Sequence, residues 1–328
     1  MTSQMGAAGP IETLLFGVPI PDEHLANLRE KYPEITFIRA PFEEMDPHLP
    51  DADAVIAWHL TPAQIAAAPR LKWLQSFAAG VERMPFADLA ARNIVVTNAS
   101  GVHAANIAEH ILAMMLGFAR QLPWLLRHPP AGDWFEMPVR GRIFELGQQE
   151  LLVVGMGDIG QGLAERARGL GMVVNGVRRR VELPAPATFA KVYPVSDLAD
   201  ALPSADHVAI CLPLTPETNR LFDAAMLARL KPTAHIYNVG RGQIIDQDAL
   251  IKALDEGAVA GAGLDVTDPE PLPADSPLWA MENVMITAHT SGSTPRYWER
   301  ILAILETNIA RFQAGEPLHN VVDGVAGY

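Results

Sequence analysis

The amino-acid sequence predicts an α/β protein made of two doubly wound parallel-sheet domains. The first observation is length, because 328 residues are about twice what one hydrophobic core usually organises. The second is the alternation of short apolar runs with helix-like stretches along most of the chain, as in right-handed βαβ units. The third is a glycine-rich turn near mid-chain that joins an apolar run to a helix, a feature typical of dinucleotide-binding sheets.

Apolar runs in the first third of the chain predict the strands of a first sheet. Helical segments of about 10–15 residues separate these runs, so the strands should be parallel and covered by helices on both faces. The runs span residues 13–18, 35–40, 54–58, 71–77 and 94–98.

A long apolar helix is expected between the first sheet and a second one. Residues 104–122 carry apolar side chains at three- and four-residue spacing, which predicts a mostly buried helix. A turn-rich stretch, 128–142, follows it. The later runs predict a complete second sheet, and they span residues 151–155, 172–177, 191–195, 207–214, 234–239, 259–266 and 284–289.

The last predicted helix, residues 294–312, is amphipathic and follows the final strand of the second sheet. A single helix of this length is not stable without packing against another element. We therefore expect it to dock on the first unit, with Gly315 at its C-cap.

The composition excludes several classes of partner. A net charge of -13 argues against nucleic acid and anionic membranes, because a polyanion would be repelled over most of the surface. The only cysteine, Cys211, rules out an intramolecular disulfide and a cysteine-based zinc site. The sequence has no run of about 20 apolar residues, and its first residues do not show the basic stretch followed by an apolar stretch that is typical of a leader. We expect a cytoplasmic protein with a small-molecule substrate, no nucleic-acid or membrane partner and no metal.

The segment 153–160, VVGMGDIG, places Gly155, Gly157 and Gly160 in a G-x-G-x-x-G pattern with Asp158 and Ile159 between the last two. The first glycine permits a tight turn, the second lets a pyrophosphate approach the backbone, and the third lets the helix pack closely on the sheet. A glycine-rich turn without a ligand is the alternative, but the strand before it and the helix after it favour a dinucleotide.

The next predicted strand ends in Arg178, Arg179 and Arg180. NAD-binding domains usually carry an acid about 20 residues after the glycines, whereas arginine at this place accommodates a 2′-phosphate. This pattern predicts NADP(H), possibly with NAD(H), as the cofactor. A solvated charge run is the alternative, and the choice between Arg179 and Arg180 as a second clamp stays open.

Further polar residues lie at or after the ends of predicted strands, namely Arg241, Asp265, Glu270 and His289. Because ligands of open α/β sheets bind at the carboxyl ends of the strands, these loops should line one crevice. Arginine can bind a carboxylate and polarise a carbonyl, histidine can transfer a proton, and glutamate can orient the histidine. The set suits hydride chemistry on a 2-oxo acid, although each residue alone could be a surface ion pair, a loop carboxylate or a hydrogen-bonded cap.

The chain resembles the D-isomer specific 2-hydroxyacid dehydrogenase family from about residue 50 to residue 322. The resemblance rests on SFAAGVE (76–82), GVHAANIAEHILAMML (101–116), VVGMGDIG (153–160), CLPLTPET (211–218), NVGRGQIID (238–246), GAGLDVTDPEPLPADSPLW (261–279) and TAHTSGST (287–294). It implies a Rossmann cofactor domain, 102–291, inserted in a flavodoxin-like substrate-binding (catalytic) domain, 1–101 and 292–328. It also implies a homodimer joined through the long helix.

The resemblance also implies the roles of individual residues. Arg241 would bind the substrate carboxylate and carbonyl, His289 would be the acid/base, and Glu270 would be its partner. The backbone of Ala79 and Gly80 would hold the substrate carboxylate. Residues implied to bind the cofactor are Leu212, Pro213, Thr218 and Val239 along its length and Asp265 at the nicotinamide carboxamide.

This sequence departs from the family pattern at Glu82, where an Asp is usual, and at Ala288, where a Pro is common. Neither position touches the implied chemistry. Glu270 speaks against the formate dehydrogenase branch, which carries Gln there. Arg178 stands where NAD-dependent members have Asp, as in glyoxylate/hydroxypyruvate reductases that prefer NADPH.

The resulting expectation is NADPH-dependent reduction of a small 2-oxo acid, of the glyoxylate or hydroxypyruvate type, to the D-2-hydroxy acid. Two alternatives stay open: oxidation of another small anion, as in phosphite dehydrogenase, and a cofactor-sensing role like that of the C-terminal-binding corepressors. The sequence does not identify the substrate. Candidates to shape its pocket are Trp58, His59, Leu60 and Trp134.

Overall fold

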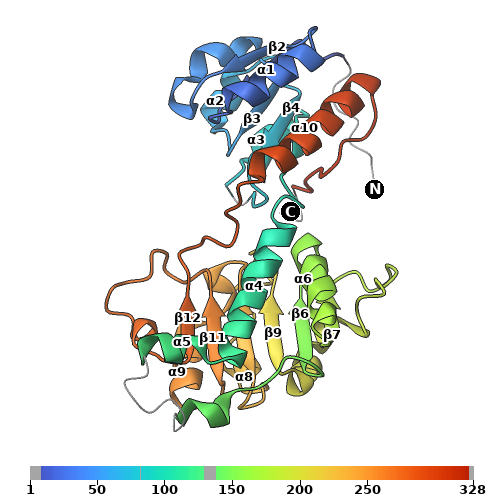
Figure 1. Ribbon diagram of the computed structural model, residues 1–328. Coiled ribbons are helices and arrows are strands. Elements are labelled where there is room, and N and C mark those ends of the chain that lie inside the picture. Colours follow the sequence, from blue (N-terminus) through green and yellow to red (C-terminus); the bar gives the residue numbers. More distant parts are fainter. Residues whose placement is uncertain (1–8, 82, 129–137, 325–328) are drawn as a thin grey trace. The chain divides into compact units, whose positions relative to one another are not determined.

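The computed structural model describes residues 9–81, 83–128 and 138–324. The chain divides into two compact units. Unit 1 comprises Met1–Val102 and Pro295–Tyr328, and unit 2 comprises His103–Thr294. Each unit contains its own parallel sheet, as the sequence predicted (Figure 1).

Unit 1 is built on a five-stranded parallel sheet with the order β2-β1-β3-β4-β5. This is the flavodoxin-like order, which confirms the predicted class of the first domain. The strands are β1 (Thr13–Phe16), β2 (Thr36–Arg39), β3 (Ala54–Ala57), β4 (Trp73–Ser76) and β5 (Val95–Thr97). The helices are α1 (Asp22–Lys31), α2 (Pro62–Ala67), α3 (Phe86–Ala91) and α10 (Tyr297–Ala314).

Both faces of this sheet are buried, which explains why its strands read as continuous apolar runs. On one face, Ile56 of β3 packs in a cluster with residues of α1 and α10. On the other face, Val55 packs with Ile65 of α2 and Leu89 of α3. Successive side chains of a strand point to opposite faces, so a sheet covered on both sides needs apolar residues at every position.

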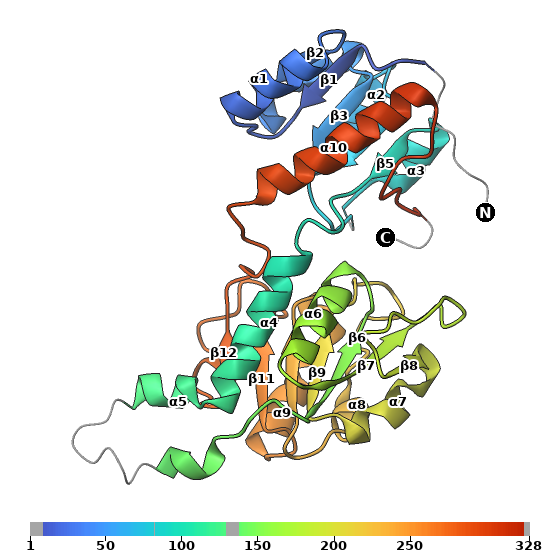
Figure 2. The same cartoon turned by 45° about the vertical axis from the view of Figure 1, so that its right-hand side comes forward.

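Helix α10 docks on unit 1, as predicted. Its buried residues Ile301, Leu305 and Ile309 join the same cluster as α1, and Figure 2 shows the two helices on one face of the sheet. The helix ends at Gly315, whose φ of 69° is the left-handed conformation of a C-cap. The predicted start at residue 294 was early, since the helix begins at Tyr297.

Unit 2 is built on a seven-stranded parallel sheet with the order β12-β11-β10-β9-β6-β7-β8. This is the Rossmann order with one added strand. The strands are β6 (Glu150–Val154), β7 (Val173–Arg178), β8 (Lys191–Pro194), β9 (His207–Ile210), β10 (His235–Asn238), β11 (Gly261–Leu264) and β12 (Val284–Ile286). The helices are α4 (Ala104–Ala119), α5 (Leu122–Arg127), α6 (Asp158–Gly169), α7 (Leu198–Ala201), α8 (Ala224–Leu227) and α9 (Gln247–Asp255).

The long predicted helix 104–122 is wrong at its end. Helix α4 stops at Ala119, Gln121 adopts a left-handed φ of 56°, and α5 starts at Leu122. Pro123 explains the break, because it has no N–H to donate to the carbonyl of Ala119 and its ring would clash with that carbonyl. The amide of Phe144 donates to this carbonyl instead, at 3.0 Å.

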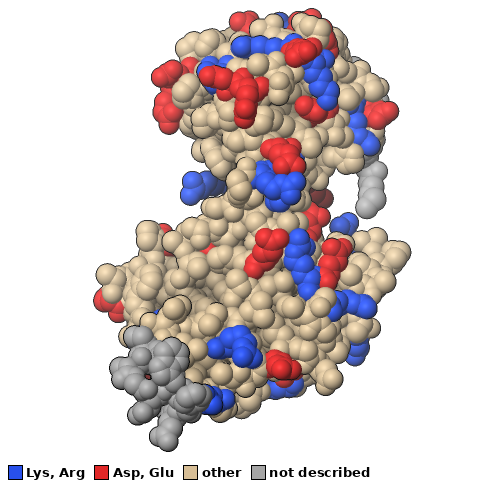
Figure 3. Space-filling view, in the orientation of Figure 1, with Lys and Arg blue, Asp and Glu red and all other residues tan. Residues whose placement is uncertain are grey.

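Charged side chains of both signs are mixed on the face of the protein seen in Figure 3. Ion pairs join Lys31 to Glu306 at 2.6 Å in unit 1 and Lys231 to Asp206 at 2.7 Å in unit 2. Among the described helices, none combines the length and the apolar composition that a membrane-spanning helix needs. The described residues contain no cluster of His, Cys, Asp and Glu side chains that could hold a metal ion.

Candidate functional site

The glycine turn between β6 and α6 has the geometry that the sequence predicted. Gly155 has a φ of 104°, and a Cβ atom there would lie 2.6 Å from the carbonyl oxygen of Cys211. A Cβ atom on Gly160 would lie 2.1 Å from the carbonyl oxygen of Gly155. At Gly157, by contrast, a Cβ atom would meet no described atom within 4 Å. The turn therefore leaves open space at the glycine that a pyrophosphate would approach, beside the first amides of α6.

The loop after β9 lies against this turn. The side chain of Leu212 would lie 3.1 Å from a Cβ atom on Gly155. The hydroxyl of Thr218 donates to the carbonyl of Pro213 at 2.8 Å and accepts from the amide of Thr215 at 2.7 Å, which closes the loop on itself. Val239 follows β10, so these predicted cofactor residues all lie at the carboxyl edge of the sheet.

The three consecutive arginines have different surroundings. Arg178 ends β7, its guanidinium donates to the carbonyl of Leu183, and its Nε is buried without a partner among the described residues. Arg179 and Arg180 are exposed. A hydrogen bond from Thr215, and more weakly the charge of Arg179, lower the pKa of Glu217 in the loop after β9. Arg178 therefore stabilises the loop after β7, whereas Arg179 and Arg180 are exposed cations.

Arg241 lies in a loop held by a residue that the sequence did not single out. The buried side chain of Asn238 accepts from the amide of Gly240 at 3.0 Å and donates to the carbonyl of Arg241 at 2.9 Å. A Cβ atom on Gly242 would lie 1.9 Å from the carbonyl oxygen of Thr267. The Arg241 loop therefore packs directly on the loop after β11, and the expected helix after it starts with Asp246 as its N-cap.

His289 and Glu270 meet, as expected for an acid/base pair. Nδ1 of His289 lies 3.1 Å from Oε2 of Glu270. The two side chains are about half exposed, at 47% and 42%. His289 adopts a left-handed φ of 51°, because β12 ends at Ile286 and the chain turns away from the sheet. The predicted strand 284–289 was therefore too long.

Asp265 is buried and holds the loop around His289. Its carboxylate accepts from the hydroxyl of Thr287 at 2.6 Å and from the amides of Thr290 and Ser291 at 2.9 and 3.1 Å. Burial raises the pKa of Asp265, but these hydrogen bonds outweigh it and lower the pKa below its usual value. Asp265 thus orients the residues on both sides of His289, a role that the sequence did not indicate.

In unit 1, Ala79 and Gly80 lie in the loop after β4. The side chain of Asn98 donates to the carbonyl of Ala79 at 2.9 Å, and Ser76 accepts from the amide of Ala78 at 3.1 Å. Within the described part of the chain, the amides of Ala79 and Gly80 have no acceptor. Two backbone donors are therefore available to an anion at the carboxyl edge of this sheet.

The residues expected to shape a substrate pocket divide into three groups. Leu60 is 1% exposed and belongs to the core, and the ring of His59 packs on Phe42 at 5.1 Å. Trp58 is 51% exposed and packs edge-on against Phe77 at 4.9 Å, next to the Ala79 loop. Trp134, like Glu82, lies outside the described residues.

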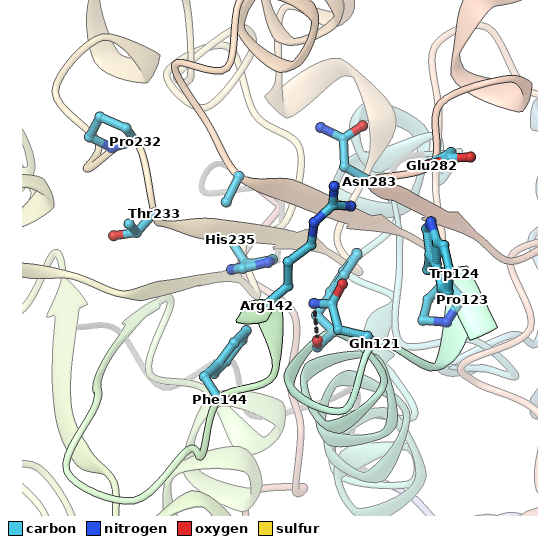
Figure 4. Close-up of a pocket in the computed structure, with 12 residues that line it drawn as sticks. Gln121, Pro123, Trp124, Arg142, Phe144, Pro232, Thr233, His235, Glu282 and Asn283 are labelled. Atoms are coloured by element: carbon cyan, nitrogen blue, oxygen red, sulfur yellow. Dashed lines mark hydrogen bonds between the residues drawn. The ribbon is translucent and has the colours of Figure 1, made fainter. Parts of the chain in front are cut away.

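A pocket of about 410 Å³ lies at the opposite edge of the unit 2 sheet (Figure 4). It is lined by residues at or before the starts of strands, including His235 and Asn283, together with Arg142 and Phe144. None of the predicted site residues lines it. It is therefore distinct from the loops that carry Arg241, Glu270 and His289.

Comparison with known proteins gives one consistent family. The domain family described as D-isomer specific 2-hydroxyacid dehydrogenase, NAD binding domain, matches residues 112–291. A glyoxylate reductase of Korarchaeum cryptofilum is 33% identical over 83% of this chain and 83% of its own. Glyoxylate/hydroxypyruvate reductase B of Salmonella typhimurium is 35% identical over 78% and 79% of the two chains.

A solved structure agrees with these sequence matches. A D-isomer specific 2-hydroxyacid dehydrogenase from Xanthobacter autotrophicus, in complex with NADPH and MES, has a TM-score of 0.82 and 30% identity. The similarity covers 97% of this chain and 100% of that one.

Proposed function

The chain belongs to the D-isomer specific 2-hydroxyacid dehydrogenase family, and from this membership we propose that it reduces a small 2-oxo acid to the D-2-hydroxy acid with NADPH. The chain is an oxidoreductase, and its unit 2 is the NAD(P)-binding domain. The proposed substrates are of the glyoxylate or hydroxypyruvate type, on which the two curated relatives are named to act. We assign the active enzyme to the cytoplasm as a homodimer.

The observation that carries the proposal is the contact between His289 and Glu270 at the carboxyl edge of the sheet. NADPH, when bound, would supply the hydride that reduces the substrate carbonyl carbon. Glu270 accepts a hydrogen bond from Nδ1 of His289, which leaves Nε2 to deliver a proton to the carbonyl oxygen. The carboxylate also stabilises the imidazolium that donates this proton.

Arg241 supplies the positive charge of the site. Its guanidinium would bind the substrate carboxylate and polarise the carbonyl, which favours hydride addition. In unit 1, the backbone donors of Ala79 and Gly80 are proposed to bind a carboxylate. The buried Asn238 supports this assignment, because it holds the loop from which Arg241 projects.

The cofactor preference is proposed from the three arginines at the end of β7. Two exposed guanidinium groups, Arg179 and Arg180, together with Arg178 can form charge-assisted bonds with a 2′-phosphate, whereas the carboxylate of an NAD-binding domain would repel it. The Xanthobacter autotrophicus relative was solved with NADPH, which supports the assignment.

The experiment that tests this function is turnover by the purified protein. NADPH should be oxidised on addition of glyoxylate or hydroxypyruvate, and phosphite with NADP should give no reduction. His289→Ala should lower kcat by about 10²–10⁴-fold, the usual contribution of a general acid, with NADPH binding retained. Absence of turnover with a broad panel of 2-oxo acids would overturn the proposal, and near-wild-type kcat in His289→Ala would remove His289 from it.

A further inference from the structure

The loop of residues 287–291 is held in a conformation that it would not adopt alone. His289 has a left-handed φ of 51°, which is unfavourable for a residue with a Cβ atom. Its amide donates to the carbonyl of Asp265 at 2.9 Å, and the Asp265 carboxylate binds the loop on either side. The surrounding contacts therefore determine where the imidazole of His289 points.

Two side chains of α4 bind this loop on both sides of His289. Nε2 of His110 lies 2.9 Å from Oγ1 of Thr287. Nδ2 of Asn106 donates to the carbonyl of Ser291 at 2.7 Å. Because residues four apart on a helix lie one turn apart on the same face, one face of α4 makes both contacts.

The hydrogen bonds around Thr287 define which nitrogen of His110 carries hydrogen. Thr287 donates its only hydroxyl hydrogen to Oδ1 of Asp265 at 2.6 Å. The carboxylate stays charged, since its hydrogen bonds keep the pKa of Asp265 below the usual value despite burial. The hydroxyl oxygen of Thr287 can then only accept from His110, so Nε2 of His110 is the donor.

Helix α4 also packs on α6, the helix that follows the glycine turn. A Cβ atom on Gly162 of α6 would lie 3.2 Å from the carbonyl oxygen of Ala104 on α4, so the two backbones approach closely. Figures 1 and 2 both show the two helices side by side. Helix α4 therefore contacts both α6, which follows the glycine turn, and the loop that carries His289.

We infer that His110 and Asn106 are positioning residues that hold His289 at a set place relative to the dinucleotide-binding helix. The inference rests on the proposed function, in which His289 delivers the proton. Neither side chain needs to touch substrate or cofactor, because both act through Thr287 and Ser291. Position 110 needs a hydrogen-bond donor at the place of Nε2. The side-chain amide of glutamine can supply this donor, and leucine cannot.

The test compares His110→Leu with His110→Gln in steady-state reduction of glyoxylate by NADPH. His110→Leu should lower kcat by about 10- to 100-fold, since a displacement on the order of 1 Å has this effect, while the Kd for NADPH stays unchanged. His110→Gln should restore most of the loss, and Asn106→Ala should shift kcat in the same direction as His110→Leu. Glu109→Gln is the matched control on α4, because its carboxylate is exposed and lies 3.6 Å from Arg166, so kcat should not change.

A kinetic isotope effect separates positioning from simple loss of folded enzyme. With NADPH deuterated at the transferred C4 position, His110→Leu should show a larger isotope effect on kcat than wild type, because the chemical step becomes slower than the others. A partly unfolded sample would lower kcat without changing the isotope effect. An unchanged isotope effect together with a lowered kcat would overturn the inference.

Thr287→Val provides a second route if His110→Leu does not fold, because it removes the hydroxyl and keeps the shape. Its kcat should fall at least as far, because Thr287→Val also removes the hydroxyl that donates to Asp265. The double variant should be no worse than Thr287→Val alone, since the bond between His110 and Thr287 is already broken there. Additive losses would overturn the inference. No turnover in wild type overturns the proposed function and this inference with it, whereas wild-type turnover that neither variant alters overturns the inference alone.

Discussion

Nδ1 of His289 lies 3.1 Å from Oε2 of Glu270, although the two residues are 19 positions apart and occupy loops that follow different strands. The Asp265 carboxylate, which precedes both residues in sequence, holds the His289 loop in place. The pair is half exposed, so a bound substrate could reach the second ring nitrogen. This relationship leads to the first prediction.

Glu270→Gln should lower kcat by roughly 10- to 1000-fold, because the amide keeps a hydrogen bond to His289 but no longer stabilises the charged imidazolium. The Kd for NADPH should stay the same, and steady-state kinetics with binding fluorescence would measure both. Glu282→Gln is the control, since it removes a carboxylate that lies 3.4 Å from His128 at the other edge of the sheet. Equal effects of the two substitutions would contradict the assignment.

Cofactor preference should depend on the arginines after β7. If Arg178 and one neighbour bind the 2′-phosphate through two charge-assisted bonds, kcat/KM should favour NADPH over NADH by about 10²-fold or more, less at high salt. Arg178→Asp should reduce or reverse this ratio and leave kcat at saturating cofactor largely intact. Arg179→Ser and Arg180→Ser would identify the second clamp.

The matched control for this prediction is Arg229→Asp, an equal change of charge at another exposed arginine of unit 2. Its ratio of NADPH to NADH activity should match that of wild type. Wild-type enzyme that uses both cofactors equally would show that Arg179 and Arg180 are solvated cations and that Arg178 only stabilises its own loop.

Acid should destabilise unit 2 through His207. This side chain is buried between Oε1 of Gln149 at 2.6 Å and the hydroxyl of Tyr237 at 3.0 Å. Burial lowers the pKa of His207 to about 3, whereas the unfolded chain has a value of about 6.5. Between these values the unfolded chain binds a proton that the folded chain does not, so the contribution of His207 to the free energy of unfolding should fall by about 2 kcal/mol from pH 7 to pH 5.

Denaturant unfolding at the two pH values would measure this loss. His207→Gln should unfold with a smaller difference between pH 7 and pH 5, because glutamine does not titrate. His128→Gln, at an imidazole whose side chain is 43% exposed, should keep the wild-type difference. An identical difference in all three proteins would exclude His207 as its source.

Apolar side chains on α4 and α5 support the proposed homodimer. Leu116, Leu122 and Leu126 are 40%, 48% and 82% exposed. Light scattering at micromolar concentration should give twice the 35.5 kDa mass of the chain, and Leu126→Glu should shift the protein toward monomer, because a charge would be buried at the contact. Val195→Glu, at a residue 41% exposed elsewhere in unit 2, is the control. A monomeric wild type would refute the proposal.

Much of the fold was predictable because its signals are local. Buried parallel strands appear as apolar runs, and the turn at Gly155 needs a residue that tolerates a φ of 104°. The break before α5 was also present in the sequence, as Pro123, but the apolar periodicity of 104–122 concealed it. The strand predicted at 284–289 was too long for a different reason. Hydrogen bonds with Asp265 turn its last residues away from the sheet, and no local sequence pattern encodes these bonds.

The sequence by itself determined the two sheets, the dinucleotide turn and the residue types that follow the strands, because periodicity and backbone freedom act over a few neighbouring positions. Only the tertiary structure decided that Asp265 serves the His289 loop and that His110 meets Thr287 across 177 positions. Such contacts require two atoms to lie within about 3 Å. That distance is set by how α4 packs on its sheet, and helix packing depends on many distant side chains at once.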